Sequence, residues 1–262
     1  MLTNPDMLHV GILPHHLQWS RFFRNLRFVV VDEAHTYRGV FGSHVAQVLR
    51  RLRRVCALYG AKPQFILASA TLANPQEHAQ NLVGLPCELV AEDGSPFGGK
   101  DFILWNPPLL GSTGRRSPNT EASFLLSELL TQGIRSLAFA PSRRLTELIN
   151  IYTRNKLEQQ PSLAAKVKPY RAGYLPEVRR QIERELFSGE LLGVVATTAL
   201  ELGVDIGHLD ATILTGYPGS IASTWQQAGR SGRSGEYSLS FLIARDNPLD
   251  QYLMHHPQAL FD

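Results

Sequence analysis

Hydrophobic residues recur along this chain in two alternating patterns, short apolar runs and longer amphipathic stretches. The apolar runs predict strands at residues 26–31, 63–68, 87–92, 136–140, 167–170, 191–196, 211–214 and 238–243. Helical spacing predicts helices between them, among them 42–59, stopped by Gly60, 75–83, a helix capped by Thr120 and ended by Gly133, and 176–187. Alternation of this kind is typical of an α/β protein with parallel sheets.

A segment rich in proline, glycine and serine separates the two sets of elements. Residues 106–120, NPPLLGSTGRRSPNT, show no apolar period and have the composition of a linker. We therefore expect a first domain over residues 1–107, a linker over 108–119 and a second domain over 120–262.

Composition excludes several classes of protein. Hydrophobic residues make up 44% and charged residues 19% of the 262 positions, as in an ordinary globular protein. The two cysteines, Cys56 and Cys87, are too few for a disulfide framework or a four-cysteine zinc site, and they fit a reducing cytoplasm. Because the chain has no run of about 18 apolar residues, we expect no membrane span.

The strongest chemical signal is VVVDEAH at residues 29–35, where an apolar strand ends in two carboxylates. The carboxyl ends of parallel strands are where open α/β sheets bind ligands. In nucleotide hydrolysis, Asp32 would hold Mg²⁺ and Glu33 would orient and deprotonate the attacking water. The alternative interpretation is a strand end followed by a solvated acidic turn.

The next apolar strand is followed by Ser69, Ala70 and Thr71. We expect the two hydroxyls to hydrogen-bond the DEAH turn and to link it to the second domain. Serine and threonine are also common at helix starts, which is the alternative interpretation.

Two further blocks lie in the second half. TTALELGVDIG at residues 197–207 places Thr197 and Thr198 at a strand end, suited to a nucleic-acid phosphate, and Asp205 in a later turn, suited to a ribose hydroxyl. QQAGRSGR at residues 226–233 predicts a helix that carries Arg230 and Arg233 on one face. Such a pair can neutralise charge on a γ-phosphate, and the alternative is a basic helix C-terminus favoured by the helix dipole.

In this order, the four blocks resemble the core of the superfamily 2 DEAD/DEAH-box helicases. Longer matches, DEAHTYRGVFGSHVAQVLRRLRR, FILASATLANP and DGSPFGGKDFILWNPP, resemble the YprA/MrfA-type helicases of bacteria. The resemblance implies two RecA-like domains of the P-loop NTPase helicase core, the first of them truncated at its N-terminus. It also implies an ATP-dependent helicase that uses ATP and Mg²⁺, moves 3′ to 5′ on DNA and serves DNA repair.

The resemblance carries roles onto further residues. It places Thr3, Asn4, Pro5, Arg143 and Arg171 against the nucleic-acid backbone, together with Thr197 and Thr198. It implies that the ATP contacts are Asp32, Glu33, Gly203, Asp205, Gln226, Arg230 and Arg233, and that His35, Ser69 and Thr71 couple the domains. The preference for DNA over RNA rests on the resemblance alone.

One expected feature of such an enzyme is missing. A phosphate-cradling loop needs a glycine-rich turn that leads into Gly-Lys-Ser/Thr at a helix start, and no such loop precedes Asp32. The near match GSPFGGK at residues 94–100 is rejected, because Asp101 replaces the hydroxyl and an apolar strand pattern follows. We therefore expect this chain alone to be inactive.

Two other functions stay open at this point. One is a double-RecA DNA translocase of the restriction or remodelling type that never separates strands. The other is a non-catalytic remnant that binds nucleic acid.

Four arginines lie between residues 50 and 54, within an apolar stripe of helical spacing. This pattern favours a solvated helix face over a DNA contact.

Overall fold

The computed structural model describes residues 1–70, 72–92, 94, 98–111, 114–201, 207–232 and 235–261. The chain divides into two compact units, Met1–Asp93 and Gly94–Asp262. None of the helices in the described ranges is long and apolar enough to cross a membrane. Each unit is described by itself.

Unit 1 is built around a pair of parallel strands. Its elements, in chain order, are α1 (Pro5–Met7), the π-helix η1 (Leu8–Ile12), α2 (Ser20–Arg24), β1 (Phe28–Val31), the 3₁₀ turn η2 (Ala34–Thr36), α3 (Gly39–Leu58), β2 (Gln64–Leu67) and α4 (Pro75–Val83). β1 and β2 pair in parallel, with Val31 opposite Leu67. Both strands therefore end at the same edge, which is the edge that carries the DEAH turn.

The long helix α3 supplies the core of unit 1. Val45, Val48, Leu49, Leu52 and Cys56 recur at helical spacing and are all buried. The helix ends where expected, because Gly60 adopts a φ of +77°, a conformation that residues with a Cβ rarely take. The helix begins three residues earlier than the predicted 42–59.

The predicted strand at residues 87–92 is wrong. Those residues have no regular structure, and Leu89 and Val90 are 51% and 90% exposed. An extended segment counts as a strand only when a neighbour accepts and donates its backbone hydrogen bonds, and sequence alternation alone does not supply that neighbour.

Unit 2 is a six-stranded parallel sheet in the order β3-β8-β7-β4-β6-β5. Its elements are β3 (Lys100–Trp105), α5 (Pro118–Thr131), β4 (Ser136–Phe139), α6 (Arg143–Lys156), α7 (Pro161–Ala164), β5 (Val167–Tyr170), α8 (Pro176–Ser188), β6 (Gly193–Ala196), η3 (Thr198–Leu200), β7 (Ala211–Thr215), α9 (Ile221–Ala228), β8 (Ser238–Ile243), α10 (Pro248–His255) and η4 (Pro257–Leu260). The predicted strands at 167–170 and 238–243 have these bounds.

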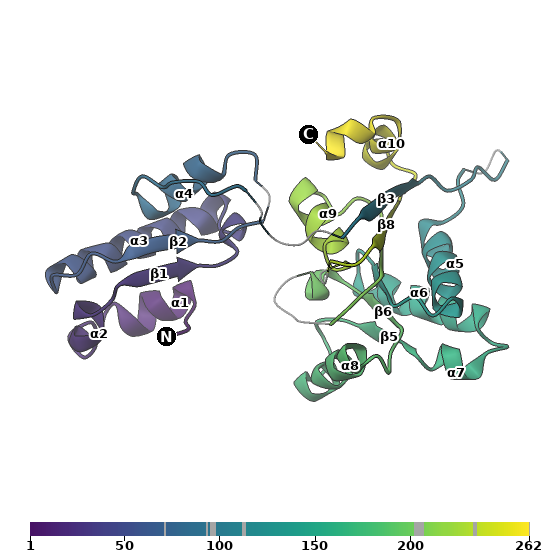
Figure 1. Cartoon of the computed structure of the whole chain (residues 1–262), viewed down its shortest axis with the longest axis horizontal. Helices are drawn as coiled ribbons and strands as arrows, with labels where there is room; N and C mark the ends of the chain where they lie inside the picture. Colours follow the sequence, from purple (N-terminus) through teal and green to yellow (C-terminus); the bar gives the residue numbers. More distant parts are fainter. Residues whose placement is uncertain are drawn as a thin grey trace. The chain divides into compact units, whose positions relative to one another are not determined.

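Helices cover both faces of this sheet. On one face, Ala138, Val195 and Ile213 pack with Leu126 of α5 and Ile149 of α6. On the other face, alternate strand residues such as Leu137, Val194 and Leu214 pack with α8. Figure 1 shows α5 and α6 together on one side of the strands and α8 on the other. The predicted α/β class with parallel sheets is confirmed.

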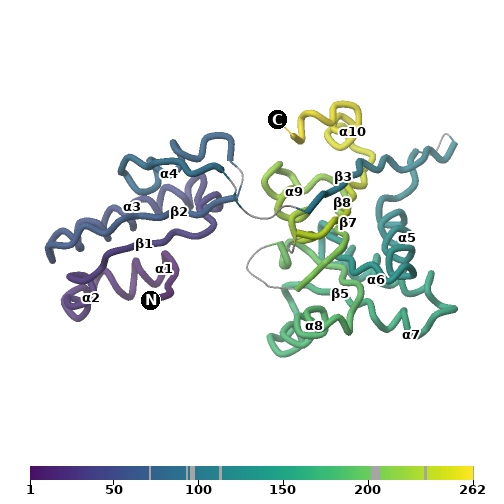
Figure 2. Tube along the Cα trace, viewed as in Figure 1, coloured from purple at the N-terminus to yellow at the C-terminus, as the bar shows by residue number. Residues whose placement is uncertain are grey.

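The expected domain boundary lies too late in the chain. β3 pairs with β8 along its whole length, from Lys100 opposite Ser238 to Trp105 opposite Ile243, so it belongs to unit 2 (Figure 2). The division falls between residues 93 and 94, not at 107–108. The sequence pattern does not reveal this, because the partner of β3 is more than a hundred residues away in the chain.

The expected cap of α5 is also misplaced. The helix begins at Pro118 with Ser117 in the N-cap position, and Thr120 lies in its first turn. Proline at the first helical position fixes φ for the helix and has no N–H to leave unpaired, so it sets the start ahead of Thr120.

Candidate functional site

The DEAH turn directly follows β1. The carboxylate Oδ1 of Asp32 accepts the backbone N–H of Glu33 at 2.9 Å, and the hydroxyl of Thr36 donates to the carbonyl of Glu33 at 2.8 Å. Glu33 has a φ of +49°, the one positive φ of a non-glycine residue in the described part of the chain. Backbone strain of this kind persists where surrounding contacts fix it, and it clusters at functional sites.

His35 fastens this turn to the segment that follows β2. Its ring is 9% exposed, and Nδ1 accepts the backbone N–H of Ala70 at 3.3 Å and lies 3.4 Å from Oε2 of Glu33. The backbone N–H of Ala34 also donates to the carbonyl of Ala68 at 2.9 Å. The two expected motifs therefore meet within unit 1.

The hydroxyl of Ser69 does not make the expected contact with the DEAH turn. It donates to the carbonyl of Ala70 at 2.8 Å, and the contact between the motifs runs through backbone groups and His35 instead. Thr71 lies outside the described residues. A hydroxyl can bond its own backbone as readily as a distant group, so residue type alone does not fix its partner.

The expected nucleic-acid residues near the start of the chain form a helix cap. Oδ1 of Asn4 accepts the backbone N–H of Met7 at 2.8 Å, and Pro5 occupies the first position of α1. Thr3 and Asn4 are exposed. The amide of Asn4 thus has a structural role in this conformation.

In unit 2, three neighbouring strands end at one level. Phe139 of β4 lies opposite Ala196 of β6, which lies opposite Tyr170 of β5. The segments that follow these strands carry Arg143, Thr197 with Thr198, and Arg171. Four of the predicted nucleic-acid residues therefore lie along one edge of the sheet.

The two arginines at this edge converge. A Cβ on Gly173 would lie 3.0 Å from Nη1 of Arg171 and 3.5 Å from Nη1 of Arg143. Arg171 is held by Glu147, whose Oε1 accepts from its Nε at 2.8 Å, and by the ring of Tyr174, whose centroid is 4.6 Å from the guanidinium carbon. Paired guanidinium groups are suited to phosphate oxygens.

Thr197 and Thr198 begin the next turn along this edge. The hydroxyl of Thr197 accepts the backbone N–H of Ala199 at 3.4 Å, and Thr198 is exposed. Gly203 and Asp205, the predicted ATP contacts of the same block, lie outside the described residues.

The prediction that Arg230 and Arg233 share one face of a helix is wrong. α9 ends at Ala228, two residues before Arg230. Gly232 adopts a φ of +75°, which a continuing helix does not allow. Gln226 lies in the last turn of α9, and Arg233 lies outside the described residues.

Arg230 is an internal residue of unit 2 in this structure. It is 4% exposed, and its Nε donates to the main-chain carbonyl of Glu201 at 2.9 Å, with Nη2 donating to the same oxygen. The guanidinium thus joins the segment after α9 to the segment after η3.

Two charged residues that the sequence did not single out complete this region. Glu201 is 8% exposed, and its carboxylate accepts from Oγ of Ser223 at 2.7 Å and from Nε2 of Gln227 at 2.9 Å. Lys100 donates from Nζ to the carbonyl of Ala228, and to the carbonyl and hydroxyl of Ser231 at 3.0 and 3.1 Å. Burial lowers the pKa of Lys100 to about 8.

The contacts of Lys100 and those of Glu201 differ in whether the sequence draws attention to the residue. Lys100 belongs to the rejected phosphate-loop match, and its ammonium lies at the C-terminus of α9, where a helix dipole favours a cation. Glu201 lies inside the block at residues 197–207, whose threonines and Asp205 are the expected contacts. Nothing in the residue types indicates that Glu201 reaches a helix more than twenty positions later.

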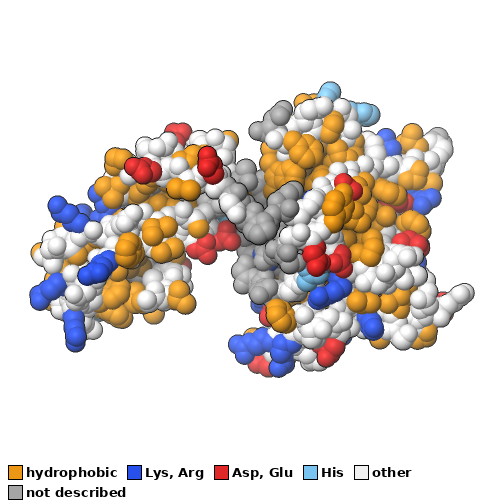
Figure 3. Space-filling view, viewed as in Figure 1, with side chains coloured by type: hydrophobic (Ala, Val, Ile, Leu, Met, Phe, Trp, Pro, Cys, Tyr) orange, Lys and Arg blue, Asp and Glu red, His pale blue; other side chains and the backbone are white. Residues whose placement is uncertain are grey.

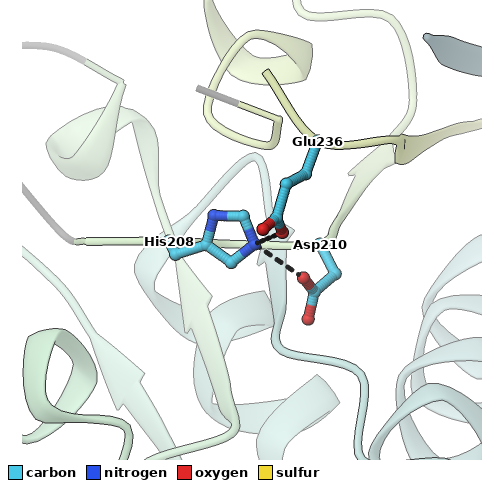
Figure 4. Close-up of side chains that lie close together, drawn as sticks. All are labelled: His208, Asp210 and Glu236. Carbon is cyan, nitrogen blue, oxygen red and sulfur yellow. Dashed lines mark ion pairs between the residues drawn. The ribbon is translucent and has the colours of Figure 1, made fainter. Parts of the chain in front are cut away.

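A cluster of titratable side chains lies beside the starts of β7 and β8 (Figure 4). Nε2 of His208 lies 3.1 Å from Oδ1 of Asp210 and 2.8 Å from Oε2 of Glu236. The other oxygen of Asp210 accepts the backbone N–H of Arg135 at 2.8 Å. The cluster ties together the segments that lead into three neighbouring strands.

The arginines of α3 have structural partners. Arg50 donates to the carbonyl of Asn81 at 3.2 Å, and Arg53 donates to the carbonyls of Val83 and Gly84 at 3.0 and 2.9 Å. They satisfy carbonyl groups at the end of α4 that the helix itself leaves unpaired. Figure 3 shows Lys and Arg side chains gathered over the part of unit 1 where α3 ends.

Two family models match the chain. The DEAD/DEAH box helicase model matches residues 1–78, and the helicase conserved C-terminal domain model matches residues 121–235. These ranges contain the DEAH turn and the blocks at 197–207 and 226–233 respectively.

Two helicases are similar in sequence to this chain over its whole length. The chain is 49% identical over 264 residues to YprA of Bacillus subtilis, an uncharacterized ATP-dependent helicase, and 44% identical over 269 residues to the ATP-dependent helicase HRQ1 of Saccharomyces cerevisiae. Each alignment covers 100% of this chain but only 35% of YprA and 25% of HRQ1.

A solved structure gives the same result. The crystal structure of the DUF1998 helicase MrfA bound to DNA and AMPPNP superposes with a TM-score of 0.92 at 50% identity, covering 99% of this chain and 36% of that one. Its fold is that of a RecA-like helicase core. Residues 1–78 therefore match the DEAD/DEAH box helicases and residues 121–235 the helicase conserved C-terminal domain, and the whole chain is similar to the YprA/MrfA-type helicases.

Proposed function

We propose that this chain is part of the motor of an ATP-dependent DNA helicase, which couples ATP hydrolysis to movement along DNA. The observation that carries the proposal is the DEAH turn: two carboxylates at the end of a parallel strand, in a strained backbone conformation, fastened by His35 to the segment after β2. MrfA, which is similar over the whole chain, has been solved with DNA and AMPPNP.

The residues of the turn fit Mg²⁺ and a catalytic base. Mg²⁺ prefers oxygen ligands and commonly keeps most of its water shell around one or two carboxylates, and Asp32 is an exposed carboxylate of this kind. When bound, the ion neutralises charge on the nucleotide phosphates. Glu33, whose side chain is 40% exposed, is assigned to orient the attacking water and to take its proton.

The two arginines after α9 receive different roles. We assign the contact with the transferred phosphate to Arg233, in line with the family resemblance. Arg230 is assigned the role of anchoring the same segment, because its guanidinium is buried and bonded to the carbonyl of Glu201. Gly203, Asp205 and Gln226 are assigned to the nucleotide by resemblance.

The nucleic-acid contact is assigned to the edge of the unit 2 sheet that carries Arg143, Arg171, Thr197 and Thr198. Guanidinium and hydroxyl groups at this edge suit the phosphate backbone, which carries no sequence information, so binding without sequence preference is expected. A role in DNA repair and a cytoplasmic location are proposals that rest on the resemblance and on the low cysteine content.

Strand displacement by the full-length protein that contains this sequence tests the proposal. With ATP and Mg²⁺, we expect release of the labelled strand from a 3′-tailed duplex, and no release with AMPPNP. ATP-driven removal of streptavidin from a biotinylated DNA without strand release would favour the non-unwinding translocase. DNA binding without ATP hydrolysis would favour the non-catalytic alternative.

A further inference from the structure

We propose that Glu201 is a positioning residue that couples the nucleic-acid contact at Thr197 and Thr198 to the arginine segment after α9. This inference rests on the function proposed above. It concerns a residue that lies inside the block at residues 197–207 but has no expected role there.

The carboxylate of Glu201 is joined to α9 on two successive turns of that helix. Oε1 accepts from the hydroxyl of Ser223 at 2.7 Å, Oε2 accepts from the amide of Gln227 at 2.9 Å, and that amide also lies 3.2 Å from the Ser223 hydroxyl. Glu201 is 8% exposed and Gln227 is 3% exposed. Both of these donors are neutral, and the buried guanidinium of Arg230 bonds the main-chain carbonyl of Glu201, not its carboxylate.

Burying a carboxylate costs free energy of folding, because the charged group loses its hydration. Packing an apolar residue of similar volume in its place is often neutral or stabilising, so stability alone does not explain a carboxylate here. What the carboxylate provides is geometry, because two hydrogen bonds to residues four apart fix both the position and the rotation of α9 relative to Glu201.

The main chain of the same residue extends the connection in two directions. The backbone N–H of Glu201 donates to the carbonyl of Thr198 at 3.0 Å, and its own carbonyl accepts from Nε of Arg230 at 2.9 Å. Leu200, between them, is 1% exposed and packs in the core of unit 2.

One residue therefore holds three parts of the molecule: the turn that carries the threonines, the helix α9, and the first arginine after that helix. A displacement of Thr198 by a bound phosphate moves the backbone of Glu201, and the contacts with Ser223, Gln227 and Arg230 transmit that movement. Arg233, three residues after Arg230, belongs to the same segment. Coupling between two ligands requires a shared element that both of them bias, and Glu201 provides one.

A binding measurement on the full-length protein tests this role. It gives the Kd for a fluorescein-labelled single-stranded oligonucleotide with and without AMPPNP and Mg²⁺. In the wild-type protein we expect the nucleotide to change the Kd for DNA by a factor in the usual range for coupled sites, about 5–150. In Glu201→Gln, which keeps the shape but removes the charge and places an amide against the amide of Gln227, we expect the factor to fall to within about twofold of unity. The Kd without nucleotide should change less than threefold.

Two further variants make the result specific. Ser223→Ala removes one of the two donors and should give an intermediate factor; it also carries the test if Glu201→Gln does not fold, as judged by circular dichroism. Glu190→Gln changes an exposed glutamate just before β6 and should keep the wild-type factor.

The coupling factor separates a positioning role from a merely structural one. The proposal is overturned if AMPPNP changes the Kd for DNA in Glu201→Gln by the same factor as in the wild type. This includes a variant whose DNA affinities with and without AMPPNP are weakened in equal proportion. A wild-type protein that binds DNA but shows no effect of AMPPNP overturns this inference alone. A wild-type protein that binds no DNA contradicts the proposed function itself, and the inference with it.

Discussion

The imidazole Nδ1 of His35 accepts the backbone N–H of Ala70 at 3.3 Å while it lies 3.4 Å from the carboxylate of Glu33. A single buried ring therefore touches both the proposed base and the segment after the next strand. Because the contact involves a backbone N–H, it depends on the position of the chain at Ala70 and not on the side chain there.

Removal of this ring should disturb the base without abolishing the fold. We expect His35→Ala to lower the free energy of unfolding by about 1–3 kcal/mol, because the N–H of Ala70 loses its acceptor. ATP turnover by the full-length protein should also fall, since the turn that carries Glu33 loses its side-chain contact with the backbone of Ala70. Denaturant unfolding and steady-state kinetics measure the two effects. His44→Ala, an exposed histidine on α3, is the control, and equal turnover in the two variants would contradict this role.

The pair of arginines beside Gly173 should contribute to DNA binding through charge. We expect Arg143→Ala and Arg171→Ala each to weaken binding to unrelated sequences by a similar factor. Each should also reduce the slope of log K against log salt concentration by about one. Fluorescence anisotropy across a salt series measures this.

The matched control is Arg154→Ala, at the opposite end of α6 from Arg143. It should leave both affinity and salt slope unchanged. A slope that falls as much in Arg154→Ala as in Arg143→Ala would show that general charge, and not this edge of the sheet, holds the DNA.

Lys100 should make the stability of the fold depend on pH. Burial lowers the pKa of Lys100 to about 8 in the folded state, from an ordinary value of 10.5. Between these values the unfolded chain binds more of this proton than the folded one, so this residue's contribution to the free energy of unfolding rises with pH. Below pH 8 the cost of burying the charge is fully present.

Urea unfolding of the 262-residue chain measures this dependence. Between pH 7 and pH 9.5, the free energy of unfolding of the wild type should rise relative to that of Lys100→Met by on the order of 1 kcal/mol, because solvent screens part of the effect at this half-buried group. Lys166→Met, an exposed lysine before β5, should show no such trend. A difference between wild type and Lys100→Met that stays constant or falls with pH would contradict the shifted pKa.

The 262-residue chain by itself should not hydrolyse ATP at the rate of a helicase. Its sequence has no Gly-Lys-Ser/Thr loop of the kind that holds the phosphates of a nucleotide. Phosphate release by the purified chain, compared with the full-length protein, measures this. Turnover by the chain that is Mg²⁺-dependent and lost in Glu33→Gln would contradict it.

The sequence predicts local structure well where local rules decide it. Gly60 ends α3, and the strand ending in Asp32 and Glu33 forms, because glycine conformation and apolar runs act within a few residues. The alternating residues 87–92 fail as a strand because no partner strand pairs with them in the described structure. The linker composition predicts a boundary that places β3 in the wrong unit, because the partner of β3 is distant in the chain.

In the candidate site, too, the sequence predicts what local rules decide and misses contacts between distant segments. The acids and threonines at strand ends could be predicted, because parallel strands present their carboxyl ends at one edge. The contacts of Glu201, Lys100 and Arg230 could not, because each joins segments that meet only in the folded sheet. The expectation that both arginines lie on one helix face assumed that α9 extends past Ala228, where it ends.

The most direct test of the proposed motor function compares ATP hydrolysis by the full-length wild-type protein with that by Glu33→Gln. Single-turnover and steady-state rates are measured with and without single-stranded DNA. We expect hydrolysis that requires Mg²⁺ and is stimulated by DNA. In Glu33→Gln we expect turnover to fall by at least about a hundredfold, with AMPPNP and DNA still bound. The control is Glu92→Gln, an exposed glutamate of unit 1, which should keep wild-type turnover. Undiminished DNA-stimulated turnover in Glu33→Gln would contradict the assignment of Glu33 as the base of an ATP-driven motor.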